Sequence, residues 1–477
     1  MSSTLPDLNF GLCLKALLVL LVIDMLAPPL QVKAQLPFET QKLSQAKLRR
    51  IARRDSLMDK KHFGRAAIEL GVDEVFVWSL DRYIRNEDYA KISFKTVGYN
   101  LNPAHWEWDN DPFQTNQFGH PYHGSYYFSS FRTNGYTFWE SVPAAFVGSY
   151  LWETFAEVQA PAPNDFINTS FGGIVLGEMT YRLSNKIVNN RSRGFKRQLS
   201  EVCALLVNPT NGLNRIMDGK WGKVMRNSNE RDSSKVAFNI DIGARRFGVN
   251  NTNGSFGWYG HASLLYGTPY EDYKKAFSNI MINVEMGKDD SSNVNTVSVY
   301  GSLVGWELSR DSSMKHLAIL SANYDFIRNA AFFYSAQSVK MNLISQFVLS
   351  RKIKFNTNVG VGPILLAAVP DKYLYKGRDY DYGSGLSVNG SGGINLGDAF
   401  FYTINYRGGW VKTINGNNSH YFLHTVSNEV RYAFNKNFAL GVEPGYFILK
   451  GHYKEHPEVN NTYPYVRASV RYSVTLK

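Results

Sequence analysis

The sequence predicts a mainly β protein, in which an antiparallel transmembrane β-barrel of about 12 strands follows an α-helical domain. Three observations predict this class. Apolar and polar residues alternate along the C-terminal half, aromatic residues make up 14% of the chain, and no stretch after residue 34 has 18 uninterrupted apolar residues. Only helices and closed barrels satisfy every backbone polar group in lipid. A chain without long apolar stretches is therefore expected to enter a membrane mainly through strands.

Residues 1–34 have the pattern of a secretory signal peptide. Lys15 precedes an apolar run over residues 16–23, and Val32-Lys33-Ala34 offers small residues for cleavage before Gln35. The apolar run is too short for a spanning helix, which needs roughly 20 residues. We expect export, so nucleic acid is not an expected partner. Cys13 would leave with the signal, and Cys203 alone could form no internal disulfide.

The barrel is expected over residues 234–477. Alternation is clearest at the end, where even-numbered residues from Val466 to Leu476 are apolar or aromatic and odd-numbered residues from Arg467 to Lys477 are polar. A soluble β-sandwich also alternates, but segments of about 12 to 16 residues exceed the usual strand length of soluble sheets. A further strand over Ile92 to Tyr99 is possible and would make the number odd. The twelve expected strands start near residues 235, 255, 276, 295, 314, 331, 352, 380, 398, 419, 437 and 463.

The first half of the mature chain divides into a basic segment and a helical domain. Residues 35–97 are expected to form a basic periplasmic segment, either a solvated linker or an arm that adheres to anionic headgroups. Residues 98–230 are expected to form the helical domain. Its two clearest helical spans run from Gly135 to Val158 and from Asn164 to Val188, where Pro163 and Asn164 suit a helix start.

The helical domain also contains the candidate catalytic residues. Two imidazoles and several carboxylates could act as general base and acid on a lipid or glycan bond, or could hold a divalent metal. Their spacing matches no established metal motif, so metal and cofactor content stay open. The structural alternative is that these groups cap helices, satisfy buried amides or pair with Arg132 and Arg182. The candidates are His120, His123, Glu140, Glu153 and Asp165, with Glu157 and Glu178 close to them in sequence and Glu178 the most structural.

Several motifs in this region follow one another in a specific order. They are Trp106 to Phe113, Asn116 to Gly124, Gly135 to Ser141, Trp152-Glu153, Asn164-Asp165 and Gly172 to Glu178. Over roughly residues 75–225 the chain resembles an uncharacterised domain family of Gram-negative envelope proteins. The resemblance implies an envelope location, often beside a β-barrel, and brings no known activity. The shorter pattern from Glu153 through Asn168 to Gly177 is similar to VanZ-like helical membrane proteins over one helical hairpin.

These features predict an outer-membrane protein that binds or passes a lipid, glycolipid or anionic glycan. One alternative is a membrane-embedded hydrolase or transferase that uses the candidate residues; another is a plugged or gated porin-like channel. The expected partners are outer-membrane lipid or lipopolysaccharide and the barrel-assembly machinery, and the oligomeric state stays open. The N-terminal domain is expected in the periplasm or in the barrel lumen. A cationic-leaning lumen is expected from inward-facing Arg245, Lys354, Glu429, Arg431, Arg467 and Arg471.

Overall fold

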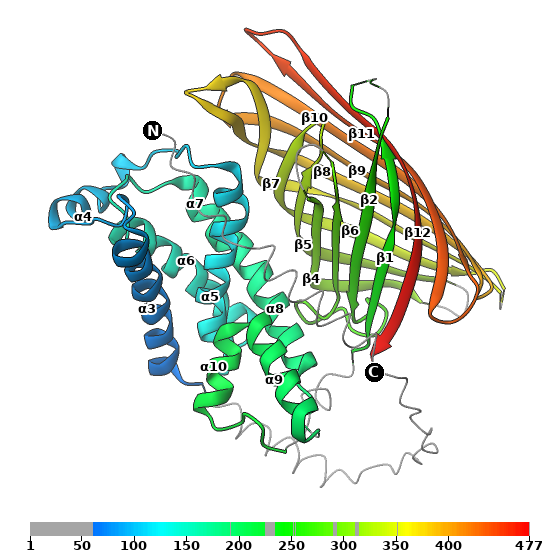
Figure 1. The fold of residues 1–477 in the computed structure, drawn as a ribbon, viewed down its shortest axis with the longest axis horizontal. Helices are drawn as coiled ribbons and strands as arrows, with labels where there is room; N and C mark the ends of the chain where they lie inside the picture. Colours follow the sequence, from blue (N-terminus) through cyan, green and yellow to red (C-terminus); the bar gives the residue numbers. More distant parts are fainter. Residues whose placement is uncertain are drawn as a thin grey trace.

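The fold is seen in a computed structural model (Figure 1), which describes residues 61–190, 192–224, 234–250, 252, 254–289, 293–310, 314–350 and 352–476. The expected signal peptide and residues 35–60 of the basic segment lie outside the described residues, whereas residues 61–97 of that segment are described and are mainly helical.

Twelve antiparallel strands close into a barrel, in which each strand pairs with its neighbours in sequence and β1 pairs with β12. The predicted fold class and strand number are confirmed. Each strand begins within four residues of its expected start. The strands are β1 (Val236–Phe247), β2 (Ser255–Tyr266), β3 (Ile280–Gly287), β4 (Val294–Arg310), β5 (Met314–Arg328), β6 (Phe333–Val348), β7 (Ile353–Tyr375), β8 (Arg378–Leu396), β9 (Phe400–Asn415), β10 (Ser419–Ala433), β11 (Phe438–Tyr453) and β12 (Val459–Leu476).

The alternation sorts side chains between the outer wall and the lumen. Along β11 and β12, Leu440, Val442 and Val470 face outward and are 45% to 53% exposed, as expected for residues that contact lipid. Asp241 and Arg467, which face inward from β1 and β12, are buried. We call the end where β1 begins and β12 ends the terminal rim, and the other end the opposite rim.

An apolar layer of inward-facing side chains crosses the lumen near the opposite rim. Phe247 at the end of β1 stacks on Tyr463 of β12, with ring centroids 5.4 Å apart. Tyr421, Leu423 and Leu449 join them from β10 and β11, and all five side chains are at most 4% exposed. The barrel's own side chains thus occupy the lumen at this level.

Below this layer, the lumen holds ion pairs between strands. Arg467 pairs with Glu285 at 2.7 Å and Glu443 at 3.4 Å, and Arg471 pairs with Asp241 at 2.7 Å and Glu429 at 3.0 Å. The expectation of a cationic-leaning lumen is therefore wrong for these arginines, because inward carboxylates on β1, β3, β10 and β11 offset them. Further inward pairs join Lys340 and Arg407 with Asp325, Arg245 with Asp289, Arg431 with Glu429, and His261 with Asp241.

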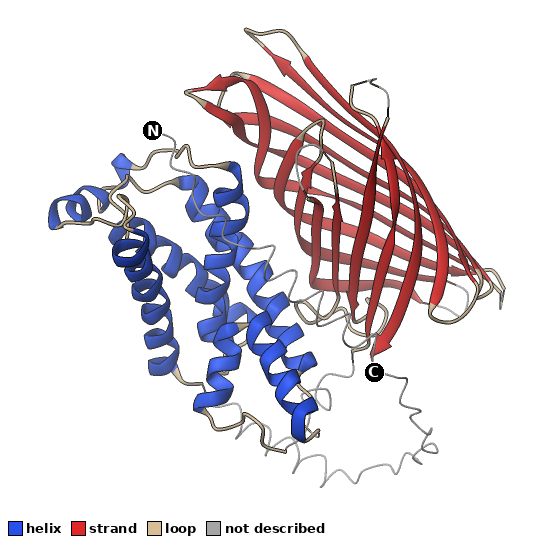
Figure 2. Cartoon of the chain, viewed as in Figure 1, coloured by secondary structure: helices blue, strands red, loops and turns tan. Residues whose placement is uncertain are grey.

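The region before the barrel is helical (Figure 2). Its described helices are α3 (Phe63–Ser79), η1 (Leu80–Arg85), α4 (Phe94–Asn100), η2 (Pro103–His105), η3 (Thr115–Gly119), α5 (His120–Arg132), α6 (Phe138–Phe155), α7 (Pro163–Ile167), η4 (Asn168–Gly172), α8 (Gly173–Ile187), α9 (Gly194–Val207) and α10 (Pro209–Met217). The possible extra strand at Ile92–Tyr99 is wrong. A capping box between Ser93 and Thr96 begins α4 there. Its side chains accept hydrogen bonds from backbone N–H groups that, in a strand, would need a neighbouring strand as acceptor.

Both predicted helical spans are confirmed. The first is α6, which begins after a capping box between Thr137 and Glu140. The second is the run of α7, η4 and α8, which follows without a break from Pro163 to Ile187. At 1.5 Å per residue this run is roughly 37 Å long, enough to follow the barrel wall across a membrane thickness.

The helical domain packs against the outer wall of the barrel and not in its lumen (Figure 1). At the terminal rim, Lys186 Nζ donates to Ser234 O at 2.5 Å and Arg182 Nη2 donates to Ala276 O at 2.7 Å. Near the opposite rim, Phe118 packs edge-on against the outward-facing Phe326 of β5, with centroids 4.5 Å apart. Within the part of the chain that the structure describes, no helix is both long and apolar enough to cross a membrane.

Candidate functional site

The structure brings several predicted residues together where α5, α7 and η4 meet. His120 begins α5, which continues directly from η3 and has Pro121 as its second residue. Its Nε2 lies 3.2 Å from Asp165 Oδ1, and its Nδ1 lies 3.1 Å from Thr169 Oγ1. Asp165 and Thr169 are four residues apart along one helix, so both present side chains to the same imidazole.

Asp109, in the chain segment before η3, extends this group. Asn164 Nδ2 donates to Asp109 Oδ1 at 2.5 Å and to Asp165 Oδ1 at 2.8 Å, so one amide bridges two carboxyl groups. We call Asp109, His120, Asn164, Asp165 and Thr169 the site cluster. Two π-helical segments, η3 and η4, border it, and such segments are frequent at functional sites.

The barrel completes the site cluster from β8. Tyr382 Oη donates to Asp109 Oδ1 at 3.1 Å, and Arg378 Nη1 donates to the Asp109 carbonyl at 2.8 Å. Asn116 Nδ2 donates to the hydroxyls of Tyr380 at 2.8 Å and Tyr382 at 2.6 Å. Sequence reasoning missed these barrel residues and Asp109. The available signal was Arg378, a charged residue in outward register on a strand of a membrane barrel, where charge is costly without a partner.

Burial sets the protonation of the site cluster. Desolvation lowers the pKa of His120 to about 4, since burial disfavours the imidazolium. Desolvation also raises the pKa of Asp165 well above its usual range, helped by the nearby charges of Asp109 and Glu153. At neutral pH the imidazole is then neutral, and the raised pKa of Asp165 favours its protonated form. A proton acceptor and a proton donor thus lie in contact.

Two further carboxylates lie beside the site cluster. Glu153 accepts from the Ala162 N–H at 2.9 Å, and burial raises its pKa well above the usual range, with the Glu157 charge adding to the shift. Glu157 accepts from Trp152 Nε1 at 2.5 Å, and burial raises its pKa to about 7. These groups form a carboxyl-rich surrounding that favours bound protons near Asp165.

His123 sits one turn along α5 from His120. Tyr127 Oη lies 2.8 Å from His123 Nε2, and the Trp152 ring meets the imidazole edge-on at 4.5 Å. Burial lowers the pKa of His123 to about 3. His123 therefore shares the same buried region but does not touch Asp165.

Glu140 and Glu178 lie elsewhere. Glu140 is exposed at the start of α6, where it completes the capping box with Thr137 and pairs with Lys61 at 2.6 Å. Its pKa falls to about 2, chiefly because Lys61 donates to its charged form. Glu178 is fully buried and pairs with Arg132 and Arg182, both at 2.7 Å, as the predicted helical pair with Arg182 required. The structure therefore brings neither residue to the site cluster.

Several buried polar atoms around the site cluster accept or donate no hydrogen bond within the described residues. They belong to side chains at most 3% exposed, and in native proteins such groups are usually satisfied. They are Asn116 Oδ1, Gln117 Nε2, Glu153 Oε1 and Asn168 Nδ2. Hydrogen-bonding capacity for a polar ligand group is thus available beside His120 and Asp165.

Over the described ranges, no three His, Cys, Asp or Glu side chains are grouped so that they could hold a metal ion.

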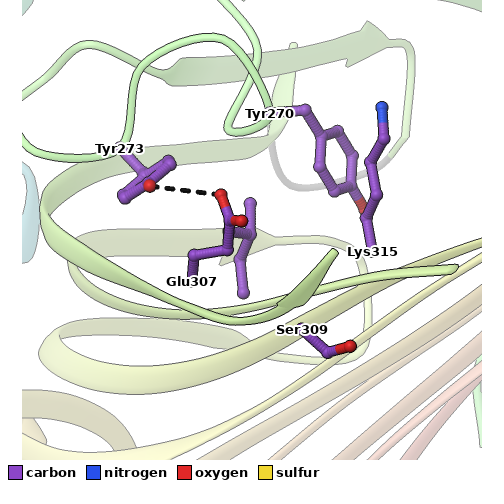
Figure 3. Close-up of a pocket in the computed structure, with 6 residues that line it drawn as sticks. Tyr270, Tyr273, Glu307, Ser309 and Lys315 are labelled. Carbon is purple, nitrogen blue, oxygen red and sulfur yellow. Dashed lines mark hydrogen bonds between the residues drawn. The ribbon is translucent and has the colours of Figure 1, made fainter. Parts of the chain in front are cut away.

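A small pocket lies far from the site cluster along the chain, at the terminal rim (Figure 3). Tyr270 and Tyr273 of the β2–β3 connection cover it, and Glu307, Ser309, Lys315 and Leu317 of β4 and β5 line it. Tyr273 Oη donates to Glu307 Oε2 at 3.2 Å. None of its lining residues belongs to the site cluster.

Solved structures that match part of the chain include a porin, an outer membrane protein and an outer membrane channel. A NanC porin structure is 8% identical and has a TM-score of 0.28, covering 48% of this chain and 98% of that chain. OmpT of Vibrio cholerae is 10% identical with a TM-score of 0.21, covering 51% and 98%. The outer-membrane channel DcaP of Acinetobacter baumannii is 8% identical with a TM-score of 0.24, also covering 51% and 98%.

No curated protein has a significant sequence match to the chain. Residues 105–210, the segment that contains the whole site cluster, match the model of a family described as a domain of unknown function, DUF3943.

Proposed function

We propose that this protein is an outer-membrane enzyme that hydrolyses or transfers a group of an envelope lipid or glycolipid. In this proposal the site cluster is its acid–base centre and the barrel is its anchor. The observation that carries the proposal is the contact of His120 with both Asp165 and Thr169, in a buried site that Tyr382 of the barrel completes.

The chemistry follows from the protonation of this pair. A neutral His120 can accept a proton from water or from an acceptor hydroxyl as that oxygen attacks the scissile centre. Protonated Asp165 can give its proton to the departing oxygen as its bond to the scissile centre breaks, so that the step leaves His120 protonated and Asp165 ionised. Environments that push the pKa values of two groups apart are characteristic of such acid–base pairs. Thr169 is then placed to orient the imidazole through its hydroxyl.

The same site could bind a lipid headgroup without changing it. Envelope lipid or lipopolysaccharide is the proposed ligand in either case, because the barrel wall and the helical domain would lie within reach of lipid. Insertion by barrel-assembly machinery is part of this proposal, and is supported by the closed antiparallel barrel.

The porin-like alternative has less support, because the lumen is filled by the apolar layer and by ion pairs. We expect the purified protein to give no steady conductance in a planar lipid bilayer. Replacing Tyr421 and Tyr463 with alanine should raise the conductance, whereas Trp410→Ala, on the outward face of β9, should not. Steady conductance from the unchanged protein would support the channel instead.

The enzymatic proposal is tested by comparing envelope lipids by mass spectrometry. Cells that lack the protein should accumulate an unmodified lipid, and expression of the unchanged chain should restore the modified form. Asp165→Asn and His120→Gln should reduce the modified lipid at least tenfold, since each removes a proton donor or acceptor from the reaction. Asp88→Asn, an exposed carboxylate outside the site cluster, is the matched control and should restore fully.

Each variant must reach the membrane as a folded barrel, shown by an unchanged heat-dependent shift in gel mobility. If cells with and without the protein have the same lipid profile, the enzymatic proposal is wrong. Lipid that copurifies with the unchanged chain but not with Asp165→Asn would then favour binding without chemistry.

A further inference from the structure

Helix α3 carries its charged residues toward the domain interior and its apolar residues outward. Arg65 pairs with Asp218 at 2.5 Å, and Glu69 accepts from Asn134 Nδ2 at 2.7 Å. On the opposite face the largest side chains are apolar and open to the surroundings. Ile68, Val72 and Phe76 are 68%, 57% and 60% exposed. A helix at a water-facing surface has the reverse arrangement.

Helix α6 shows the same inversion. Its inner face buries Ser141, Ser149 and Glu153 beside small residues, Phe138 and Trp152, whereas Trp139 and Val147 point outward and are 58% and 51% exposed. Two helices of one domain thus bury polar groups and leave large apolar groups exposed. Contiguous apolar surface of this kind marks a membrane or protein contact.

The position of the domain identifies the contact. The domain covers the outward wall of the barrel from Lys186 at the terminal rim to Asn116 beside Tyr382 near the opposite rim (Figure 1). That wall is the surface a membrane barrel presents to acyl chains, and its uncovered part includes Val442 and Val470. Between these two contacts the domain therefore lies beside the wall, at the height of the lipid layer.

We propose that the outward faces of α3 and α6 contact the acyl chains of the membrane, and so replace the lipid-facing surface that the domain covers on the barrel. The buried polar side chains are then shielded from lipid by the apolar shell. This proposal does not depend on catalysis at the site cluster, since it concerns only the outer surface of the domain.

The test measures fluorescence quenching by lipids brominated in their acyl chains, with the full chain in phospholipid nanodiscs. In a Cys13→Ser, Cys203→Ser background, single cysteines at Val72, Val147, Val442 or Glu455 carry a bimane label. Val442 is the lipid-facing reference on β11, and Glu455 is the exposed reference in the β11–β12 connection. Labels at Val72 and Val147 should show at least half of the quenching seen at Val442, and the label at Glu455 should show little.

Quenching at Val72 and Val147 no greater than at Glu455 overturns the proposal. Strong quenching by aqueous iodide would then place the two faces in water. Protection from both bromine and iodide would instead show that a second copy or another protein covers them. If a variant fails the gel-mobility test of folding, Ile68 replaces Val72 on the same face of α3.

Discussion

Replacing Glu178 with alanine is expected to destabilise the helical domain by about 3–5 kcal/mol. Glu178 is fully buried and accepts from both Arg132 and Arg182, and Arg182 also holds the barrel through Ala276 O. Removing the carboxylate leaves two guanidinium groups in a low-dielectric region without the charge that offset them. The measurement is urea unfolding of the full chain in detergent, followed by the helical circular-dichroism signal.

The control for Glu178 is Asp88→Ala, which removes an exposed carboxylate that pairs with Lys91. It should leave the unfolding midpoint unchanged, because exposed pairs contribute little. Equal midpoints for Glu178→Ala and the unchanged chain would mean that the buried pairs do not stabilise the domain.

Replacing Gly124 with alanine is expected to cost about 3 kcal/mol or more, and to separate His120 from Asp165. A Cβ at Gly124 would lie 1.8 Å from the Thr169 carbonyl oxygen and 3.1 Å from Gly173 Cα. Both obstacles are backbone, so α5 and η4 would have to move apart. In cells the lipid product should fall together with the unfolding midpoint.

Gly71→Ala is the matched control, since the added Cβ at this position of α3 meets no atom within 4 Å. Alanine is the better helix former, so the midpoint should rise by an amount equivalent to about 0.5–1 kcal/mol. A Gly124→Ala variant as stable as the unchanged chain would show that α5 and η4 tolerate a wider separation than the structure has.

Much of the fold could be predicted because successive side chains of a strand face opposite sides of the sheet. Residues that face lipid and residues that face the lumen therefore alternate in the sequence. In the segment from Val466 to Leu476, the alternation of apolar and polar residues identifies the outer and inner faces of the barrel wall. Turn residues between such segments mark where the strands begin and end. The helical spans were also readable, because Pro163 and the capping residues before α6 act locally. For the segment from Ile92 to Tyr99 the prediction was wrong. Its alternation is typical of a strand, but the capping box at Ser93 begins a helix there.

The site cluster was predictable only in part. His120, Asp165 and Glu153 were named from their residue types and close spacing, and the structure places them in one buried region. Glu140 is also a carboxylate in this part of the sequence, but it is exposed and caps the start of α6. Asp109 and Tyr382 are 273 positions apart, and no local pattern connects them.

The sequence alone thus determined a closed barrel with helices before it, because secondary structure and the facing of side chains depend on short-range periodicity. The tertiary structure decided that the helices cover the outer wall, that inward carboxylates offset the lumen arginines, and that β8 completes the site cluster. Those features depend on contacts between segments that are far apart in the chain. Packing and charge pairing between such segments produce no periodic pattern in the sequence.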